Sequence, residues 1–132
     1  MELLPPQPTA IGDPALFRGE VYLDSLTAAD NRVRVLMVRF SPGAYNAWHC
    51  HVNGQTLHVV DGVGLVQERG KEIQIIEAGD TIWTPAGEWH WHGAAPDRFM
   101  THLAIMEGLA EGQEGLETEW GEFAEVYGYP GM

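Results

Sequence analysis

The chain of 132 residues is predicted to fold as an all-β domain, a sandwich or barrel of short strands. Sixteen glycines and eight prolines are spread along it, which is typical of a chain with many turns. Between these turns, apolar and polar residues alternate over short runs, as expected for strands with one face in a core. A turn recurs about every eight to twelve residues, and this spacing favours a sandwich or barrel over a sheet covered by helices.

The elements follow from the same signals, in order along the chain. Residues 1–16 contain four prolines, which lack backbone donors, so we expect an extended N-terminal arm that packs over a surface or a sheet edge. The Asp61-Gly62 pair is typical of a tight hairpin turn and is expected to separate two strands. The predicted strands cover residues 17–23, 32–40, 47–51, 55–60, 64–68, 72–76, 81–84, 89–92 and 99–106.

The C-terminal segment, residues 111–132, is rich in glutamate and is expected to present a solvated face. Helical spacing relates four apolar residues in it: Leu116, Trp120, Phe123 and Tyr127. This spacing predicts a short amphipathic helix at the end of the domain. Gly121 lies inside that helix and weakens the prediction, because glycine destabilises helix interiors.

Charge and composition exclude several classes of partner and location. The formal net charge is −12, so nucleic acid and anionic membranes would repel the chain. It has no apolar run long enough to span a bilayer, and residues 1–12 lack the basic and apolar regions of a secretory signal. A single cysteine, Cys50, excludes an internal disulfide framework. We therefore expect a cytoplasmic protein that acts on a small molecule.

Four residues with metal-ligand side chains lie in two segments interrupted by glycines. His49 and His51 are two residues apart, so on a strand they point to the same face. Gln55 follows a turn, and His90 follows a second turn that can return the chain beside the first pair. Any one histidine could be a satisfied core or surface side chain. Together, three imidazoles and an amide oxygen favour one divalent metal, and the amide favours manganese or iron.

The two segments resemble the paired motifs of the cupin superfamily. The matching residues are Gly43, His49, His51 and Gly62 in the first motif and Gly79, Pro85, Gly87 and His90 in the second. The chain has Gln55 where the usual ligand is glutamate, and Ala94 where asparagine is common. The resemblance covers roughly residues 33–106. It implies a jelly-roll barrel, the double-stranded β-helix of cupins, as a single domain over residues 1–132. It says little about the reaction, because cupins host many chemistries.

A narrower resemblance points to small bacterial single-domain cupins that include manganese-dependent hydroxynitrile lyases. It is carried by Trp48-His49-x-His51, Gly54-Gln55-Thr56-Leu57, Gly87-Glu88-x-His90-Trp91-His92-Gly93-Ala94 and Thr101-His102-Leu103-Ala104-Ile105. It implies one manganese ion per chain, held by His49, His51, Gln55 and His90, and a homodimer or homotetramer. Iron(II), zinc, nickel and cobalt stay open as alternatives.

The neutral ligand set also bears on the reaction. Without a glutamate ligand the metal keeps its full positive charge, acts as a stronger Lewis acid and is less easily oxidised. This favours a lyase on small hydroxylated or carbonyl substrates, such as one that cleaves a cyanohydrin. One alternative is an iron(II) dioxygenase that uses the same four ligands. The other is a non-catalytic cupin that binds a metal or a small molecule.

Two further histidines are candidate catalytic residues. His92 can share the inward face with His90, and His102 lies on the last predicted strand of the barrel. A neutral imidazole beside a hydroxyl group can accept its proton, although either ring could merely support a ligand or a turn. The resemblance also places both positions in the active site. Four apolar residues are expected to line a pocket for a small, mostly apolar substrate: Leu36, Val38, Phe40 and Met106.

Overall fold

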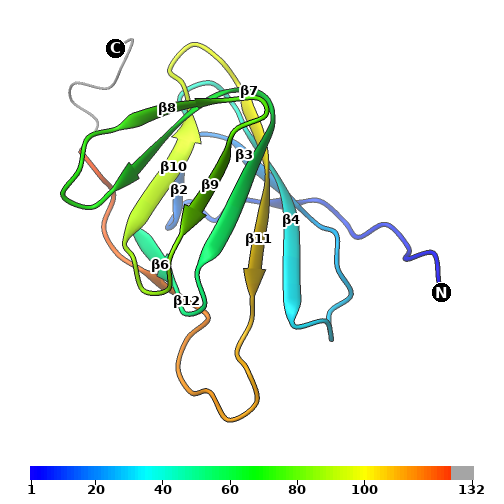
Figure 1. Ribbon diagram of the computed structural model, residues 1–132. Coiled ribbons are helices and arrows are strands. Elements are labelled where there is room, and N and C mark those ends of the chain that lie inside the picture. Colours follow the sequence, from blue (N-terminus) through cyan, green and yellow to red (C-terminus); the bar gives the residue numbers. More distant parts are fainter. Residues whose placement is uncertain (126–132) are drawn as a thin grey trace.

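The structure is a computed structural model that describes residues 1–125 as strands joined by turns, as the sequence predicts (Figure 1). Within this range no residue is helical, and no segment could cross a membrane as a helix. The strands are β1 (Ala10–Ile11), β2 (Phe17–Arg18), β3 (Val21–Ser25), β4 (Val33–Phe40), β5 (Tyr45–Asn46), β6 (His49–His51), β7 (Gln55–Glu68), β8 (Gln74–Glu77), β9 (Thr81–Thr84), β10 (His90–Ala94), β11 (Met100–Glu107) and β12 (Thr118–Trp120).

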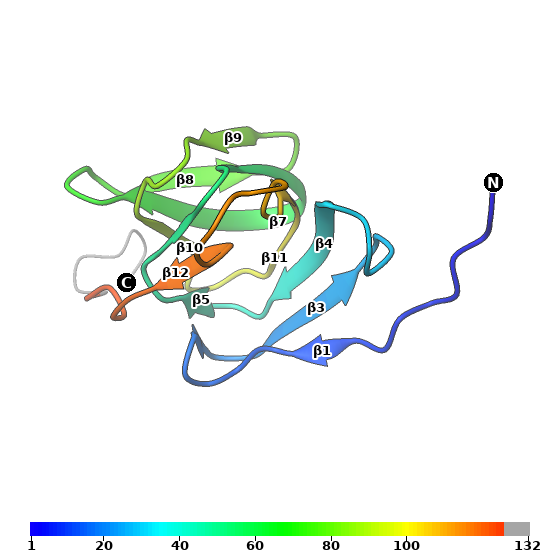
Figure 2. The ribbon, with the colours of Figure 1, turned by 90° about the horizontal axis from the view of Figure 1, so that it is seen from below.

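The strands form two antiparallel sheets that share β7 and curl around a common interior (Figure 2). One sheet runs β1-β3-β4-β11-β7 and continues to β9. The other contains β8, β7, β10, β5 and β2, and β6 joins it beside β10. Because the inward side chains of both sheets meet, residues from β4, β7, β10 and β11 surround one space.

Strand β7 differs from the predicted pair of strands separated by a hairpin turn. It runs unbroken through Asp61 and Gly62, with its first part in one sheet and its second part in the other. The register against β11 shifts between Thr101 and His102, which marks a bulge. Gly62 has φ of 84°, so the chain bends there without reversing. The glycine that predicted a turn is instead the corner that lets one strand serve both sheets.

The backbone conformation at Gly62 leads to a testable prediction about the stability of the fold. A Cβ added at Gly62 would overlap the carbonyl oxygen of Phe99, in addition to the strain of a positive φ. We expect Gly62→Ala to lower the free energy of unfolding by about 3 kcal/mol. The matched control is Gly70→Ala, because Gly70 has φ of 85° and nothing lies within 4 Å of an added Cβ. Urea unfolding should show a loss of only about 1 kcal/mol for the control; equal losses would contradict the prediction.

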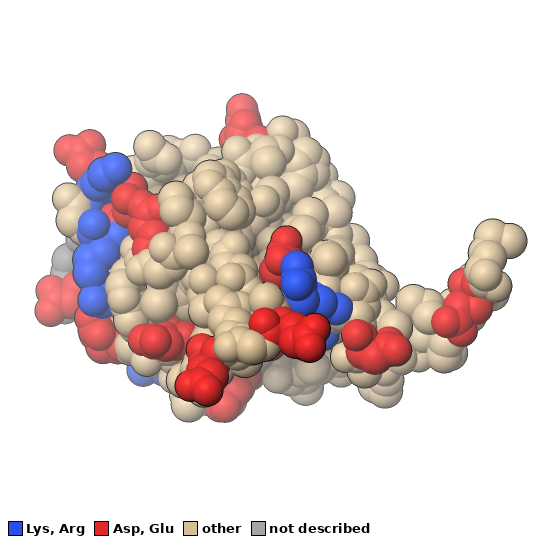
Figure 3. Space-filling view, turned by 60° about the horizontal axis from the view of Figure 1, so that its bottom comes forward, with Lys and Arg blue, Asp and Glu red and all other residues tan. Residues whose placement is uncertain are grey.

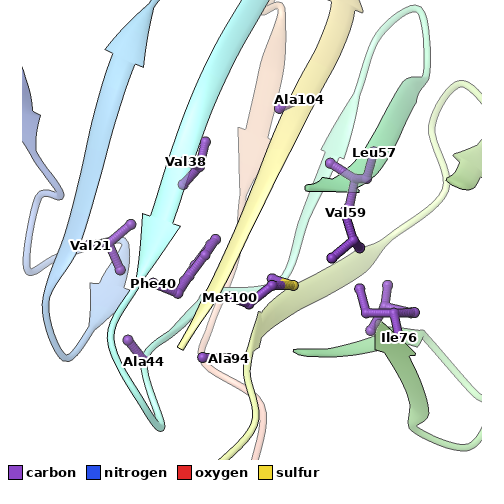
Figure 4. Packing of buried hydrophobic residues seen from close by; sticks show 11 residues of the cluster. Val21, Val38, Phe40, Ala44, Leu57, Val59, Ile76, Ala94, Met100 and Ala104 are labelled. Carbon is purple, nitrogen blue, oxygen red and sulfur yellow. The ribbon is translucent and has the colours of Figure 1, made fainter. Parts of the chain in front are cut away.

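The apolar core fills one end of the space between the sheets (Figure 4). Phe40, Met100, Leu57 and Val59 are almost fully buried there and come from three different strands. Since each of these strands alternates inward and outward residues, the same inward faces continue past the core to polar residues. Packing in the core therefore holds these strands in position, and other inward residues of the same strands form part of the candidate site.

The C-terminal segment does not form the predicted helix within the described residues. Thr118–Trp120 is strand β12, which pairs with β6, and Leu116 is exposed rather than packed. The helical spacing was misleading, because the backbone of β6 offers this segment a ladder of hydrogen bonds. Tyr127, the last residue of the expected helix, lies outside the described residues. The acidic side chains that Figure 3 shows lie in separate groups, some with arginine or lysine beside them.

Smaller differences occur near the N-terminus. The strand predicted over residues 17–23 is divided into β2 and β3 at Gly19, which has φ of 76°. Strand β5 lies between the strands predicted over residues 32–40 and 47–51, where no strand was expected. Residues 1–9 extend away from the body of the chain (Figure 2), and Ala10–Ile11 pairs with β3.

Candidate functional site

The four predicted metal ligands come together from three strands. His49 and His51 are on β6, Gln55 begins β7, and His90 begins β10 directly opposite His49. All four side chains are buried. The ligand atoms of the three histidines lie within 4.8 Å of one another. This spacing lets one ion reach all three rings.

Hydrogen bonds orient these rings through their Nδ1 atoms. Nδ1 of His49 donates to the carbonyl oxygen of Ala47 at 2.7 Å, and Nδ1 of His90 donates to that of Glu88 at 3.0 Å. A carbonyl oxygen can only accept, so Nδ1 carries the proton and Nε2 keeps its lone pair in the neutral ring. Nδ1 of His51 lies 3.1 Å from Oγ1 of Thr118. This arrangement leaves Nε2 of each ring available as a ligand.

The donor set fits a cation on two further observations. Nε2 of His90 lies 3.0 Å from Oε1 of Gln55, and both atoms are acceptors when Nδ1 of His90 is protonated. Two facing acceptors repel each other unless a cation binds both. Nε2 of His51 is buried with no hydrogen-bond partner among the described residues. Binding a metal would satisfy all of these atoms, since imidazole nitrogen and amide oxygen are both metal ligands.

Burial keeps the ligand imidazoles neutral. It lowers the pKa of His90 to about 4, and burial followed by repulsion from His90 lowers the pKa of His51 to about 4. Burial, with repulsion from His90 as the next cause, also lowers the pKa of His49 well below its usual value. Near pH 7 the three rings are therefore uncharged and ready to bind a metal without first losing a proton.

The two candidate catalytic histidines lie next to each other beside this cluster. Nε2 of His102 is 3.1 Å from Nδ1 of His92, so one ring donates its proton to the other. Nδ1 of His102 is buried and has no partner among the described residues. Burial lowers the pKa of His102 to about 4, and burial together with repulsion from His102 lowers the pKa of His92 well below its usual value. Both rings are neutral near pH 7 and can accept a proton.

A cavity of about 130 Å³ connects three of the four candidate metal ligands, His49, His51 and Gln55, with these two histidines, whereas His90 does not line it. The volume is close to the ~150 Å³ of an engineered apolar cavity that holds benzene. Leu36, Val38 and Met106 line it, as expected from the sequence. Phe40 does not: its ring is packed in the core, 5.3 Å from the centre of the His102 ring. The other lining residues are Phe17, Leu23, Asn46, His49, His51, Gln55, His92, His102, Ala104, Thr118 and Trp120.

Six of these lining residues were not among the site residues predicted from the sequence: Phe17, Leu23, Asn46, Ala104, Thr118 and Trp120. Asn46 is buried, accepts the backbone N–H of His92 through Oδ1 at 3.0 Å and places Nδ2 3.3 Å from Nε2 of that ring. It lies on the two-residue strand β5, which is too short to show a period. Thr118 and Trp120 lie in the segment expected to be helical. A prediction of residues 118–120 as a strand would have placed the side chains of Thr118 and Trp120 on one face.

Comparison with known proteins gives the family. The model of the cupin domain matches residues 36–106. The chain is 45% identical over 108 residues to an (R)-mandelonitrile lyase from Granulicella tundricola, covering 80% of this chain and 79% of that protein. The crystal structure of a cupin-like protein from Thermotoga maritima is 35% identical with a TM-score of 0.79, covering 90% of this chain and 87% of that one.

A second similar structure, also from Thermotoga maritima, is described as a predicted oxalate decarboxylase. It is 26% identical with a TM-score of 0.63 and covers 70% of this chain and 84% of that one. The matched region, residues 36–106, contains both glycine-interrupted segments and all four candidate ligands. On the family model, the identity to its relatives and the shared fold, the chain belongs to the cupin family.

Proposed function

We propose that the chain is a metal-dependent lyase that cleaves small aromatic cyanohydrins to an aldehyde and hydrogen cyanide. The observation that carries this proposal is the relative named (R)-mandelonitrile lyase, which is 45% identical over four fifths of the chain. The cavity supports it, because its volume of about 130 Å³ and its apolar wall of Leu36, Val38 and Met106 suit one small aromatic molecule.

We propose that His49, His51, Gln55 and His90 hold one divalent metal, and that this metal is manganese. The amide oxygen of Gln55 favours a harder ion than three imidazoles alone would select, which supports manganese or iron(II) over zinc, nickel or cobalt. When bound, the metal supplies a Lewis acid that polarises a substrate oxygen. The protein supplies the neutral rings, their orientation and the exclusion of water.

In the proposed reaction His102 moves the proton. Its unpartnered Nδ1 accepts the proton of the substrate hydroxyl while the carbon–nitrile bond breaks, and the electron pair of that bond leaves with cyanide. The electron pair of the former O–H bond becomes the second bond of the aldehyde carbonyl. His102 then returns the proton to cyanide, so atoms and charges balance. His92 holds Nε2 of His102 through their 3.1 Å contact and can share the proton.

The homodimer or homotetramer implied by the resemblance stays a prediction. The outer face of the sheet that contains β4 and β11 supports it. Met37 lies beside Leu103 there, and Val35 lies beside Ile105. Both pairs are half-buried and carry no charge, and the carboxylate of Asp24 beside Met37 is paired with Arg39 at 2.9 Å, which limits the repulsion of a second copy of this acidic chain.

The test is cyanide release from racemic mandelonitrile by protein reconstituted separately with manganese(II) and iron(II). We expect turnover above the metal-free background with manganese, and consumption of one enantiomer followed by chiral chromatography. The same samples are assayed for oxygen uptake with phenolic and diketone substrates. Oxygen uptake with iron and no cyanide release would support the dioxygenase instead. Ligand-induced thermal stabilisation without turnover in either assay would support a binding module.

A further inference from the structure

Strand β12 lies against β6, the strand that carries two of the candidate metal ligands (Figure 1). The antiparallel register places Thr118 opposite His51 and Trp120 opposite His49. Side chains of directly opposed residues project from the same face of a sheet. Thr118 and Trp120 therefore share the inner face with the two histidines, and both line the cavity.

Backbone hydrogen bonds hold β12 in place beyond its own three residues. The N–H of Val52 donates to the carbonyl of Glu117 at 2.9 Å, and the N–H of Gly121 donates to that of Trp48 at 2.7 Å. The carboxylate of Glu117 also binds Arg34 at 3.0 Å, although such a partly exposed ion pair contributes little. These backbone hydrogen bonds, which continue the pairing with β6 beyond both ends of β12, are thus the main reason that this segment covers the site.

The Trp120 ring lies over His49. The two ring centres are 4.6 Å apart and the planes are tilted by 30°. Trp120 also approaches Phe17, another residue that lines the cavity, at 6.0 Å between ring centres. An aromatic ring in this position keeps water from one side of His49 and reinforces the contact between β12 and the ligand strand.

Thr118 makes the chemically specific contact. Its Oγ1 lies 3.1 Å from Nδ1 of His51. The corresponding atoms of His49 and His90 bind backbone carbonyl oxygens, so His51 alone among the three rings depends on a side chain from another segment. If Oγ1 accepts the Nδ1 proton, Nε2 keeps its lone pair, and Nε2 is the buried atom without a partner.

We propose that Thr118 is a positioning residue of the metal centre, which sets the tautomer and ring orientation of His51 from the C-terminal strand. Strand β12, within the acidic C-terminal segment, is therefore part of the site. The inference rests on the metal binding in the proposed function and is independent of the reaction that follows.

The test compares Thr118→Val and Thr118→Ser in the full chain. Valine keeps the branched shape suited to a strand and removes the hydroxyl group, whereas serine restores it. We expect Thr118→Val to weaken manganese(II) binding by about 10- to 100-fold and Thr118→Ser to remain near wild type. Electron paramagnetic resonance of free manganese(II) measures the affinity. Thr81→Val is the matched control, because Oγ1 of Thr81 binds Nδ1 of the non-ligand His58 at 2.8 Å.

A second readout needs no metal. Nitrogen-15 chemical shifts of the imidazoles in metal-free protein report which ring nitrogen carries the proton. We expect His51 to be protonated on Nδ1 in the wild type and to lose this preference in Thr118→Val. The rings of His49 and His90 serve as internal references and should not change, because their carbonyl partners remain.

Three results would overturn the inference. Thr118→Val could bind manganese(II) within twofold of wild type, Thr81→Val could lose as much affinity, or the His51 tautomer could stay unchanged. In these cases the metal site itself would stand, because the wild type still binds. If the wild type binds no manganese(II), iron(II) or zinc(II), the metal part of the proposed function fails together with this inference.

Discussion

Replacing His49 and His51 together by alanine is expected to remove the metal and the activity at once. The two rings are adjacent inward residues of β6 and supply half of the candidate ligands. The remaining pair, Gln55 and His90, cannot close around an ion. Metal content should fall from about one ion per chain to background, measured by elemental mass spectrometry on protein purified without an affinity tag. Loss of a Lewis acid worth several kcal/mol should lower kcat/KM for cyanohydrin cleavage by about 10³-fold or more.

The matched control is His58→Ala. His58 lies on β7 with the opposite parity to Gln55, on the outer side of the sheet, where it binds Thr81. Its loss should leave metal content and turnover unchanged. Circular dichroism shows whether the double variant keeps its strands, since both deleted rings are buried. A folded double variant that still holds about one metal per chain would rule out this site.

His102→Gln is expected to lower kcat for cyanohydrin cleavage by about 10²- to 10⁴-fold while the metal content stays at the wild-type level. His102 is not among the clustered ligand atoms, so the metal should remain. The substitution removes Nδ1, the buried nitrogen without a partner that we assign to the substrate proton. Steady-state kinetics with mandelonitrile, together with metal analysis of the same sample, measure both effects.

The substitution His92→Gln distinguishes the role of His92 from that of His102. We expect a smaller loss of kcat than for His102→Gln, because in the proposed reaction the substrate proton goes to His102. His92 contacts His102 and Asn46 and supports the reaction through His102. A larger loss for His92→Gln, with activity retained in His102→Gln, would transfer the proton step to His92. His58→Gln is the control for the substitution itself, and it should behave as wild type.

Local periodicity was enough to predict that the side chains of His49 and His51 lie together. His49 and His51 are two residues apart on an extended segment, so the alternation of a strand determines that they share a face. Leu36, Val38 and Met106 were placed on the cavity side by the same reasoning. Phe40 has the same parity but lies deeper, because alternation fixes the face of a sheet and not the position along the interior.

The errors arose where one local pattern fits two structures. Asp61-Gly62 suits both a hairpin turn and a bulge with a positive φ, and only pairing with β10 and β11 selects the continuous strand. Likewise, Leu116 and Trp120 have helical spacing, but residues 118–120 form a strand because their backbone pairs with the edge of β6. In both cases the deciding hydrogen bonds come from residues distant in the sequence.

By itself, the sequence determined that the chain is built of short strands, which residues face inward and which side chains can bind a metal. These properties depend on alternation, turn residues and ligand chemistry, all of which are local. Only the tertiary structure decided that Asn46, Thr118 and Trp120 join the site and that His102 lies beside His92. Those contacts link segments as many as 67 residues apart, as between His51 and Thr118, and depend on how β7 turns the corner between the two sheets.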